Sequence, residues 1–110
     1  MSTTSEFHEG EKRCRSEIAR VMYQRGLSHD LISEITGLSQ DQVIQYRLLA
    51  AIFGKSSDVP ELYNDQDTAE TQRGVKQAQK ELAQALLRHH QPAEVVSELT
   101  LLSKSELDLL

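Results

Sequence analysis

The chain has 110 residues with two Phe, three Tyr and no Trp, and 38% of its residues are hydrophobic. This length suits one ordinary domain or two very small ones, and the scarcity of aromatic residues argues against a large common core. The formal net charge of −5 argues against indiscriminate attraction to nucleic acid.

The excess of negative charge lies mostly in the first ten residues and in the segment 48–69, whereas the segment 11–47 carries six basic and five acidic residues. The single cysteine, Cys14, cannot form a disulfide within the chain, which favours a reducing compartment. The polar N-terminus lacks the apolar region of a signal peptide, and no run approaches the roughly 18 apolar residues of a membrane span. We therefore expect a cytoplasmic protein without a membrane partner.

A long amphipathic helix is predicted before Gly26. Its apolar face follows the spacing i, i+4, i+7, i+8 through Cys14, Ile18, Val21 and Met22. Gly26 ends this helix as a glycine cap does, because glycine adopts a left-handed backbone at little cost.

Two shorter helices are predicted next. Ser28 is placed to cap a helix over residues 29–36. The sequence Ser39-Gln40-Asp41-Gln42 has the Ser-x-x-Gln form of a capping box, which predicts the start of a third helix. We expect this third helix to run through Ala51 or Phe53 and to stop at Gly54.

The second half of the chain repeats this order after a flexible acidic linker over residues 55–67. The second long helix is expected to begin near Asp67 or Thr68. Its apolar face lies in the same register as that of the first helix and consists of Ala78, Leu82, Ala85 and Leu86. Pro92 is expected to start the next short helix, and Ser103-Lys104-Ser105-Glu106 forms a second capping box.

The two halves align with each other at an offset of 64 positions. The segment 6–46 lies over the segment 70–110 without a gap, and ten of these 41 positions are identical. Ser33-Glu34 meets Ser97-Glu98, and Leu38-Ser39 meets Leu102-Ser103. We interpret this as a tandem repeat with one unit over 1–54 and a degenerate unit over 68–110; the alternative is two unrelated helical segments with similar patterning.

Residues 28–47 have the pattern of a helix-turn-helix. Ile32, Ile35 and Leu38 can pack on Val43, and Gly37 lies in the turn, where a positive φ is needed. The second unit keeps the apolar positions as Val96, Leu99, Leu102 and Leu107, but it has Leu101 in place of glycine. A side chain disfavours positive φ, so we expect this second turn to open or to change its type.

A DNA-reading helix in the first unit would present Gln40, Gln42, Gln45 and Arg47. Glutamine can bind adenine in the major groove through two hydrogen bonds. Affinity, however, comes mainly from Lys and Arg on phosphates, and Arg47 is the only such residue in this helix, while Asp41 lies at its start. The charges therefore favour a packing unit over a DNA reader.

The sequence presents no active site. His89 and His90 lack a Cys or a further His at ligand spacing, so a role at a helix end is favoured over a metal site. Cys14 lies on the apolar face and is expected in a core or an interface. No paired carboxylates, Ser-His-Asp set or phosphate-binding loop is present, and we expect neither catalysis nor a cofactor.

The first unit resembles the C-terminal tail of the Rpn family, the recombination-promoting nuclease or transposase-like proteins of bacteria. The residues that carry the resemblance are Gly10, Gly26-Leu27-Ser28, Ile32, Thr36-Gly37-Leu38-Ser39 and Val43. The second unit matches less well, through Thr100, Leu102-Ser103 and Leu107. In that family the nuclease chemistry belongs to an upstream domain of the PD-(D/E)xK type, and this sequence carries no such motif. The resemblance implies a tail-like role, because short C-terminal products of the family are thought to associate with the full-length nuclease and to restrain it.

The sequence therefore predicts an all-α protein built from two tandem three-helix, helix-turn-helix-like units. We expect it to act by protein association, through homo-oligomerisation or through binding to a related helical protein such as an Rpn-type nuclease. The expected interface comprises Cys14, Ile18, Val21, Met22, Ala78, Leu82, Ala85 and Leu86. The alternatives are a DNA-binding regulator that uses Gln40, Gln42, Gln45 and Arg47, and a decayed gene fragment without a role.

Overall fold

The computed structural model describes residues 5–52, 54 and 59–110, and all regular secondary structure in these residues is α-helical. The all-α fold class is therefore confirmed. The helices are α1 (Ser5–Gln24), α2 (His29–Thr36), α3 (Gln40–Ile52), α4 (Ala69–Arg88), α5 (Ala93–Thr100) and α6 (Lys104–Asp108). Within the described ranges, no helix is both long enough and apolar enough to cross a bilayer.

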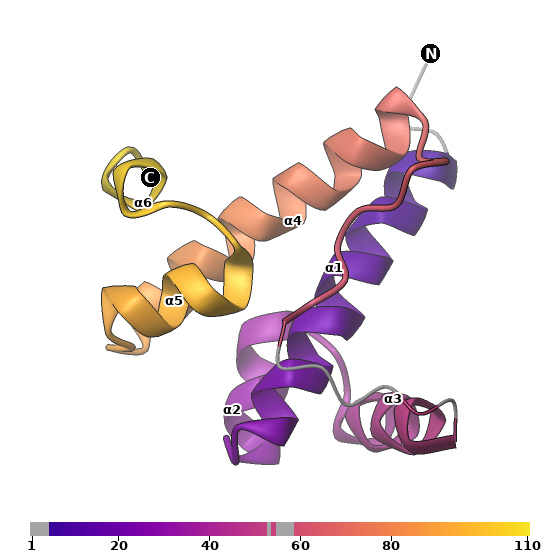
Figure 1. Cartoon of the computed structure of the whole chain (residues 1–110). Helices are drawn as coiled ribbons and strands as arrows, with labels where there is room; N and C mark the ends of the chain where they lie inside the picture. Colours follow the sequence, from indigo (N-terminus) through magenta and orange to yellow (C-terminus); the bar gives the residue numbers. More distant parts are fainter. Residues whose placement is uncertain (1–4, 53, 55–58) are drawn as a thin grey trace.

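The two long helices form the centre of the molecule. Figure 1 shows that α1 and α4 begin at the same end and then diverge, with α2 beside α1 and α5 beside α4. Gly10 and Gly74 lie where the two helices meet, and both are buried. A Cβ atom built on Gly10 would overlap the carbonyl oxygen of Thr71, and one built on Gly74 would overlap that of Phe7. The absence of a side chain at both positions lets the two backbones touch.

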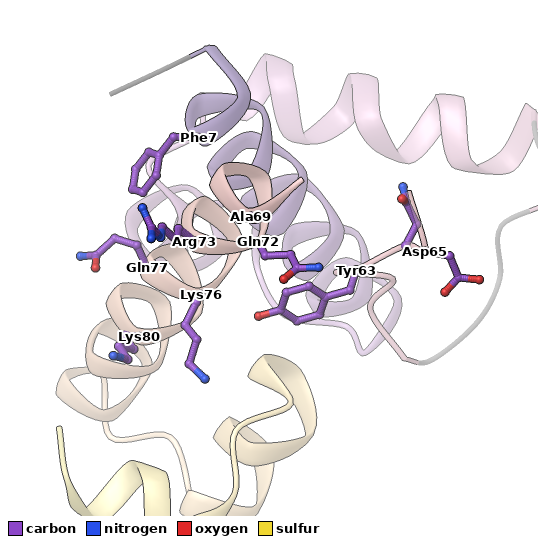
Figure 2. A pocket seen from close by; sticks show the side chains of 10 residues that line it. Phe7, Tyr63, Asp65, Ala69, Gln72, Arg73, Lys76, Gln77 and Lys80 are labelled. Atoms are coloured by element: carbon purple, nitrogen blue, oxygen red, sulfur yellow. The ribbon is translucent and has the colours of Figure 1, made fainter. Parts of the chain in front are cut away.

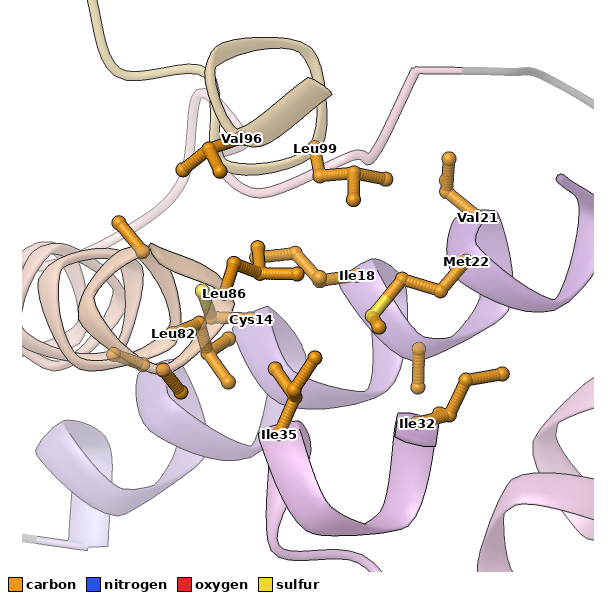
Figure 3. Close-up of a cluster of buried hydrophobic side chains, with 14 of the residues drawn as sticks. Cys14, Ile18, Val21, Met22, Ile32, Ile35, Leu82, Leu86, Val96 and Leu99 are labelled. Carbon is orange, nitrogen blue, oxygen red and sulfur yellow. The ribbon is translucent and has the colours of Figure 1, made fainter. Parts of the chain in front are cut away.

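One hydrophobic core lies between the diverging parts of α1 and α4 and continues under the short helices (Figure 3). Ile18 and Met22 of α1 and Leu82 and Leu86 of α4 have no exposed surface. The short helices add Ile32, Ile35, Leu38, Val43, Val96, Leu99, Leu102 and Leu107. The apolar faces of the two halves thus cover each other, as bodies of this size need to do to remove enough apolar surface from water.

The ends of the first three helices follow the sequence prediction closely. The hydroxyl oxygen of Ser28 accepts a hydrogen bond from the backbone N–H of Leu31 and caps α2, which spans the predicted residues. Ser39 and Gln42 form the expected reciprocal capping box at the start of α3. Gly26 has φ +84° and ends the chain's first helix as predicted. Phe53, one of the two expected ends of α3, lies outside the described residues.

Residues 64 positions apart make the same hydrogen bonds in the two halves. Thr36 and Thr100 each donate a hydroxyl hydrogen bond of 2.7 Å to the carbonyl oxygen four residues earlier. The turn after α1 and the turn after α4 share the same pattern, with the N–H of Leu27 bonded to the carbonyl of Met22 and that of Gln91 to the carbonyl of Leu86. The ends of the equivalent helices therefore share the same local hydrogen bonds.

The turn between α5 and α6 corrects the sequence prediction. Leu101 adopts a left-handed conformation with φ 63° and ψ 16°, close to the φ 75° and ψ 7° of Gly37. The turn therefore keeps its type. The hydroxyl of Ser97 donates a 2.6 Å hydrogen bond to the carbonyl of Leu102, whose side chain is buried. These tertiary and local contacts hold Leu101 in a conformation that its side chain disfavours.

The described part of the linker, residues 59–67, differs from the flexible connection that its composition suggested, whereas residues 55–58 of the predicted linker lie outside the described residues. Residues 59–67 lie along α1 (Figure 1), and Leu62 is only 1% exposed. The guanidinium of Arg13 donates hydrogen bonds of 2.8 Å to both carboxylate oxygens of Asp67 and one of 3.3 Å to the carbonyl of Leu62. Thr68 then caps α4, which starts at Ala69. Contacts with several side chains of α1 thus hold this segment in place, although its polar composition predicts flexibility.

Candidate functional site on the exposed face of α3

The turn before α3 sets the direction of this helix. Gly37 supplies the positive φ, and its N–H donates to the carbonyl of Ser33. The hydroxyl of Ser33 donates to the carbonyl of Leu38, which is a close contact that a larger side chain at this position would prevent. Leu38 and Val43 are buried at the crossing of α2 and α3. These residues form the predicted helix-turn-helix geometry.

The inner side of α3 packs on α1 through two aromatic residues. Tyr46 and Tyr23 pack against the core, and the guanidinium carbon of Arg47 lies 4.8 Å from the centre of the Tyr23 ring. The ring of His29 also stacks on that of Tyr23, and the two ring centres lie 5.2 Å apart. The cation of Arg47 is thus held against an aromatic face of its own chain.

The outer side of α3 carries an apolar stripe. We define the α3 stripe as Gln45, Leu48, Leu49 and Ile52, whose positions follow the helical spacing i, i+3, i+4, i+7. The exposed fractions of the three apolar residues are 52% for Leu48, 42% for Leu49 and 75% for Ile52. Contiguous apolar surface of this kind marks interaction sites more often than a single exposed leucine does.

The charged residues of α2 and α3 are mostly acidic. Asp30, Glu34 and Asp41 are exposed on α2 and the first turn of α3, and Arg47 is the only Lys or Arg between residues 26 and 54. A DNA-reading helix needs several cations close to the phosphates that flank the groove. The charges on this face are therefore better suited to a protein than to a phosphate backbone.

The four residues of the DNA-reading alternative are all exposed, but most are engaged within the chain. Gln40 donates its side-chain N–H to Asp30, and Gln42 accepts the N–H of Ser39 in the capping box. Arg47 lies over Tyr23. Gln45 makes no hydrogen bond with the described residues and is the one of the four that is ready to contact a partner.

The eight residues of the expected interface lie elsewhere than on the surface. They are all buried between α1 and α4 or under the short helices, as Figure 3 shows for Cys14, Ile18, Val21, Met22, Leu82 and Leu86. Ala78 has no exposed surface, and Ala85 is 8% exposed. The face that these residues form is covered by the other half of the same chain.

The titratable residues of the core and the helix ends do not assemble a reactive site. Burial raises the pKa of the Cys14 thiol to about 12, so this thiol is a poor nucleophile at neutral pH. His89 Nε2 lies 3.7 Å from Glu34 Oε2, and His90 takes the positive φ of the turn after α4. In the described part of the chain, no group of three or more His, Cys, Asp or Glu side chains could hold a metal ion.

The spacing of the apolar residues in α3 would have revealed the α3 stripe, although their position in the sequence suggests a core. Leu48, Leu49 and Ile52 follow Val43 so closely that they read as a continuation of the core, whereas the helix turns them away from it. A helical projection of residues 40–52 separates the buried Val43 from the exposed stripe. The sequence prediction also missed a second surface feature, a groove on α4 that is lined by Lys76, Lys80, Phe7 and Tyr63. Phe7 and Tyr63 are distant in sequence from the two lysines, so their proximity depends on the fold.

Residues 15–48 match the Rpn/YhgA-like nuclease family, C-terminal HTH domain. The match runs from the middle of α1 to Leu48 of α3, so it includes the whole helix-turn-helix and the start of the α3 stripe. It concerns a helical domain and not a catalytic one. Neither the curated proteins nor the solved structures yielded a match. This part of the chain is therefore similar to a helix-turn-helix module from the tail of that nuclease family.

Proposed function

We propose that the chain is a non-enzymatic protein-association module whose α3 stripe binds the α3 stripe of another unit of this kind, in the first place that of a second copy. The observation that carries the proposal is the exposure of Leu48, Leu49 and Ile52 at helical spacing on a helix whose single Arg, Arg47, lies over the ring of Tyr23. This spacing is the one through which a helix packs along another helix.

The α3 stripe is complementary to itself. Two α3 helices can run antiparallel and cross between Leu48 and Leu49. Leu48 of one copy then contacts Leu49 of the other, and Gln45 of one copy contacts Ile52 of the other. No charged side chain belongs to the stripe, and the cation of Arg47 is held on Tyr23, away from it. A twofold contact of this type closes on itself and yields a dimer rather than a filament.

The size of the stripe predicts a weak complex. Three partly exposed apolar side chains offer less area than the roughly 800 Å² per partner of a standard stable interface. We therefore expect a dissociation constant on the order of 10 to 100 μM, which is typical of transient association.

We also propose that the fold consists of two tandem units, which pair with each other within one chain. The equivalent hydrogen bonds of Thr36 and Thr100, and the reciprocal contacts of Gly10 and Gly74, support it. In this arrangement the long-helix faces are used internally. Among the described residues, α3 presents this stripe, and the equivalent helix α6 spans only Lys104–Asp108.

The match of residues 15–48 supports a related helical tail as the second binder of the same stripe. In this proposal, an Rpn-type nuclease that carries a unit of this kind is bound through its own third helix. The chain restrains the nuclease by occupying a surface that the nuclease uses for its own association.

Sedimentation equilibrium at protein concentrations from 5 to about 500 μM tests the proposal. We expect the unmodified chain to shift from monomer to dimer over this range and Ile52→Glu to remain monomeric, because a buried unpaired carboxylate opposes the contact. Leu109→Glu is the matched control, since Leu109 is 85% exposed but lies outside the stripe. A chain that stays monomeric throughout and does not bind a nuclease tail would remove the proposal.

The DNA-reading alternative keeps one specific observation in its favour, the unengaged and exposed Gln45 on a helix-turn-helix that matches an HTH domain. It predicts that Gln45→Ala loses sequence preference and that binding falls steeply with salt. Absence of any duplex shift at 20 mM salt, roughly the condition most favourable to phosphate contacts, would end this alternative.

A further inference from the structure

We propose that the exposed side of α4 binds an extended acidic polypeptide segment, in a groove that is separate from the α3 stripe. The groove has a volume of about 1110 Å³ and is bordered by α4, the first turns of α1 and residues 63–65 (Figure 2). Its cations are Arg73, Lys76 and Lys80. The proposal does not depend on the dimer proposed above.

The cations of the groove stand out in an acidic chain. Lys76 and Lys80 have no ion-pair partner among the described residues, while Arg73 pairs with Glu70 at 2.6 Å in an exposed position. Glu106, which accepts the N–H of Ser103 in the capping box of α6, interacts electrostatically with both lysines, and Asp65 lies at the border of the groove. The two lysines lie one helical turn apart and are exposed, so an anionic ligand can reach both from solvent.

Aromatic side chains form the two borders of the groove. Figure 2 shows Phe7 of α1 on one side of α4 and Tyr63 on the other. The hydroxyl of Tyr63 donates a 2.6 Å hydrogen bond to the side chain of Gln79, which fixes the ring. The groove therefore offers apolar contact as well as positive charge, as a peptide with mixed side chains requires.

The class of ligand follows from what lies on the equivalent side of α1. There, residues 59–67 run as an extended acidic segment, with Asp67 held by Arg13 and the N–H of Glu61 bonded to the Glu17 carboxylate at 2.9 Å. Arg20 donates to the carbonyl of Val59 at 3.4 Å. This side of the long helix binds an extended acidic chain within the molecule itself.

The corresponding side of α4 is open. Gln77 and Lys80, which line the groove, are 64 positions after Arg13 and Ser16, which lie under the bound segment. No described segment covers them, and both are exposed. Two of the three basic residues are specific to this half, because the positions equivalent to Arg73 and Lys80 are Glu9 and Ser16, whereas Lys76 corresponds to Lys12. A second extended acidic segment, supplied by another polypeptide, fits this side.

The test uses the full chain and a labelled peptide with the sequence of residues 59–67, VPELYNDQD, in a fluorescence anisotropy titration at low salt. We expect saturable binding that weakens about tenfold in Lys76→Glu/Lys80→Glu, because two favourable charges become repulsive. Lys12→Glu is the matched control; it lies 64 positions before Lys76, is exposed and is outside the groove. It should leave binding unchanged, whereas a peptide with Gln and Asn in place of Glu61, Asp65 and Asp67 should bind at least tenfold more weakly, roughly as expected for lost ion pairs.

Three outcomes would overturn the proposal. The first is no saturable binding of the peptide by a chain whose circular dichroism shows intact helices. The second is an equal loss in Lys12→Glu and in the groove variant, which would indicate a response to net charge alone. The third is binding of a thymidine oligonucleotide, but not of the peptide, in a manner that depends on Lys76 and Lys80, which would assign the groove to nucleic acid.

Discussion

Gly10 and Gly74 face each other across the point where α1 touches α4, and each lies against a backbone carbonyl of the opposite helix. Glycine inside a helix normally lowers stability relative to alanine by about 1 kcal/mol. At these two positions the sign reverses, because a methyl group has no room and its neighbours are backbone atoms that cannot turn aside. The pair fixes the approach of the two long helices and hence the shape of the core.

Gly10→Ala is accordingly expected to lower the free energy of unfolding by about 2 to 3 kcal/mol, the range of an overpacked contact, and Gly74→Ala should do the same. Urea unfolding followed by circular dichroism measures the effect. His8→Ala, at an exposed position of the same helix, is the control and should change stability by less than about 0.5 kcal/mol. A gain in stability in Gly10→Ala would mean that the two helices do not touch here.

A second prediction concerns Leu101, where substitution by glycine should raise stability instead of lowering it. Leu101→Gly should raise the free energy of unfolding by about 0.5 to 1 kcal/mol, since glycine relieves the left-handed backbone at φ 63° and the lost side chain is 44% exposed. The reciprocal variant Gly37→Leu should cost about 1 to 2 kcal/mol through its backbone alone, because a Cβ at Gly37 meets no atom within 4 Å. Leu109→Gly, at an ordinary negative φ, should bring no gain. Destabilisation by Leu101→Gly would show that this turn is not strained.

Asp67 makes the free energy of unfolding depend on pH in the acidic range. Burial acts to raise the pKa of its carboxyl, but the N–H of Asn64 and the guanidinium of Arg13 outweigh that effect, so the pKa lies below its usual value. A lowered folded-state pKa gives stability that is present above the unfolded value of about 3.9 and is lost as the pH falls through the folded value. Asp67→Asn should therefore be less stable at pH 7 and should lose less stability on acidification than the unmodified chain. Asp108→Asn, which removes an exposed carboxylate, should keep the original pH dependence; equal curves for all three proteins would contradict the role of Asp67.

Cys14 reports on the core. Its thiol has no exposed surface, and burial raises its pKa to about 12, so a disulfide reagent at pH 8 should leave it unmodified in the folded protein. In urea it should react completely, at the rate of a free thiol. Rapid reaction of the folded chain would indicate that α1 and α4 separate readily, and it would favour exchange of units between chains over a stable internal pair.

The features that were predictable from sequence are those with short-range causes. Ser28, the capping box at Ser39 and the cap at Gly26 depend on hydrogen bonds within a few residues, and their positions were predicted correctly. The all-α class followed from the spacing of apolar residues such as Ile18 and Met22. The helix-turn-helix geometry followed because Gly37 and the leucines around it leave one way to pack.

The features that were missed depend on contacts across the molecule. Leu101 keeps the turn that glycine would prefer, because the buried Leu102 and the Ser97 hydroxyl hold the chain there. Residues 59–67 of the linker are held on α1 by Leu62 and Asp67, although their composition predicts flexibility. The expected interface residues lie in the core because each half supplies the cover of the other. The exposed α3 stripe was missed for another reason, because its residues directly follow the buried Val43 and only a helical projection separates them from it.

Disulfide trapping is the most direct measurement of association through α3. Leu49→Cys places a thiol beside the proposed twofold axis, and the buried native Cys14 does not compete with it. Under mild oxidation at about 50 μM, within the expected range of the dissociation constant, the account predicts that Leu49→Cys becomes a covalent dimer within minutes and that Leu109→Cys stays largely monomeric. Equal trapping of both variants, or no trapping of Leu49→Cys, would contradict the claim that the α3 stripe is the surface through which this protein associates.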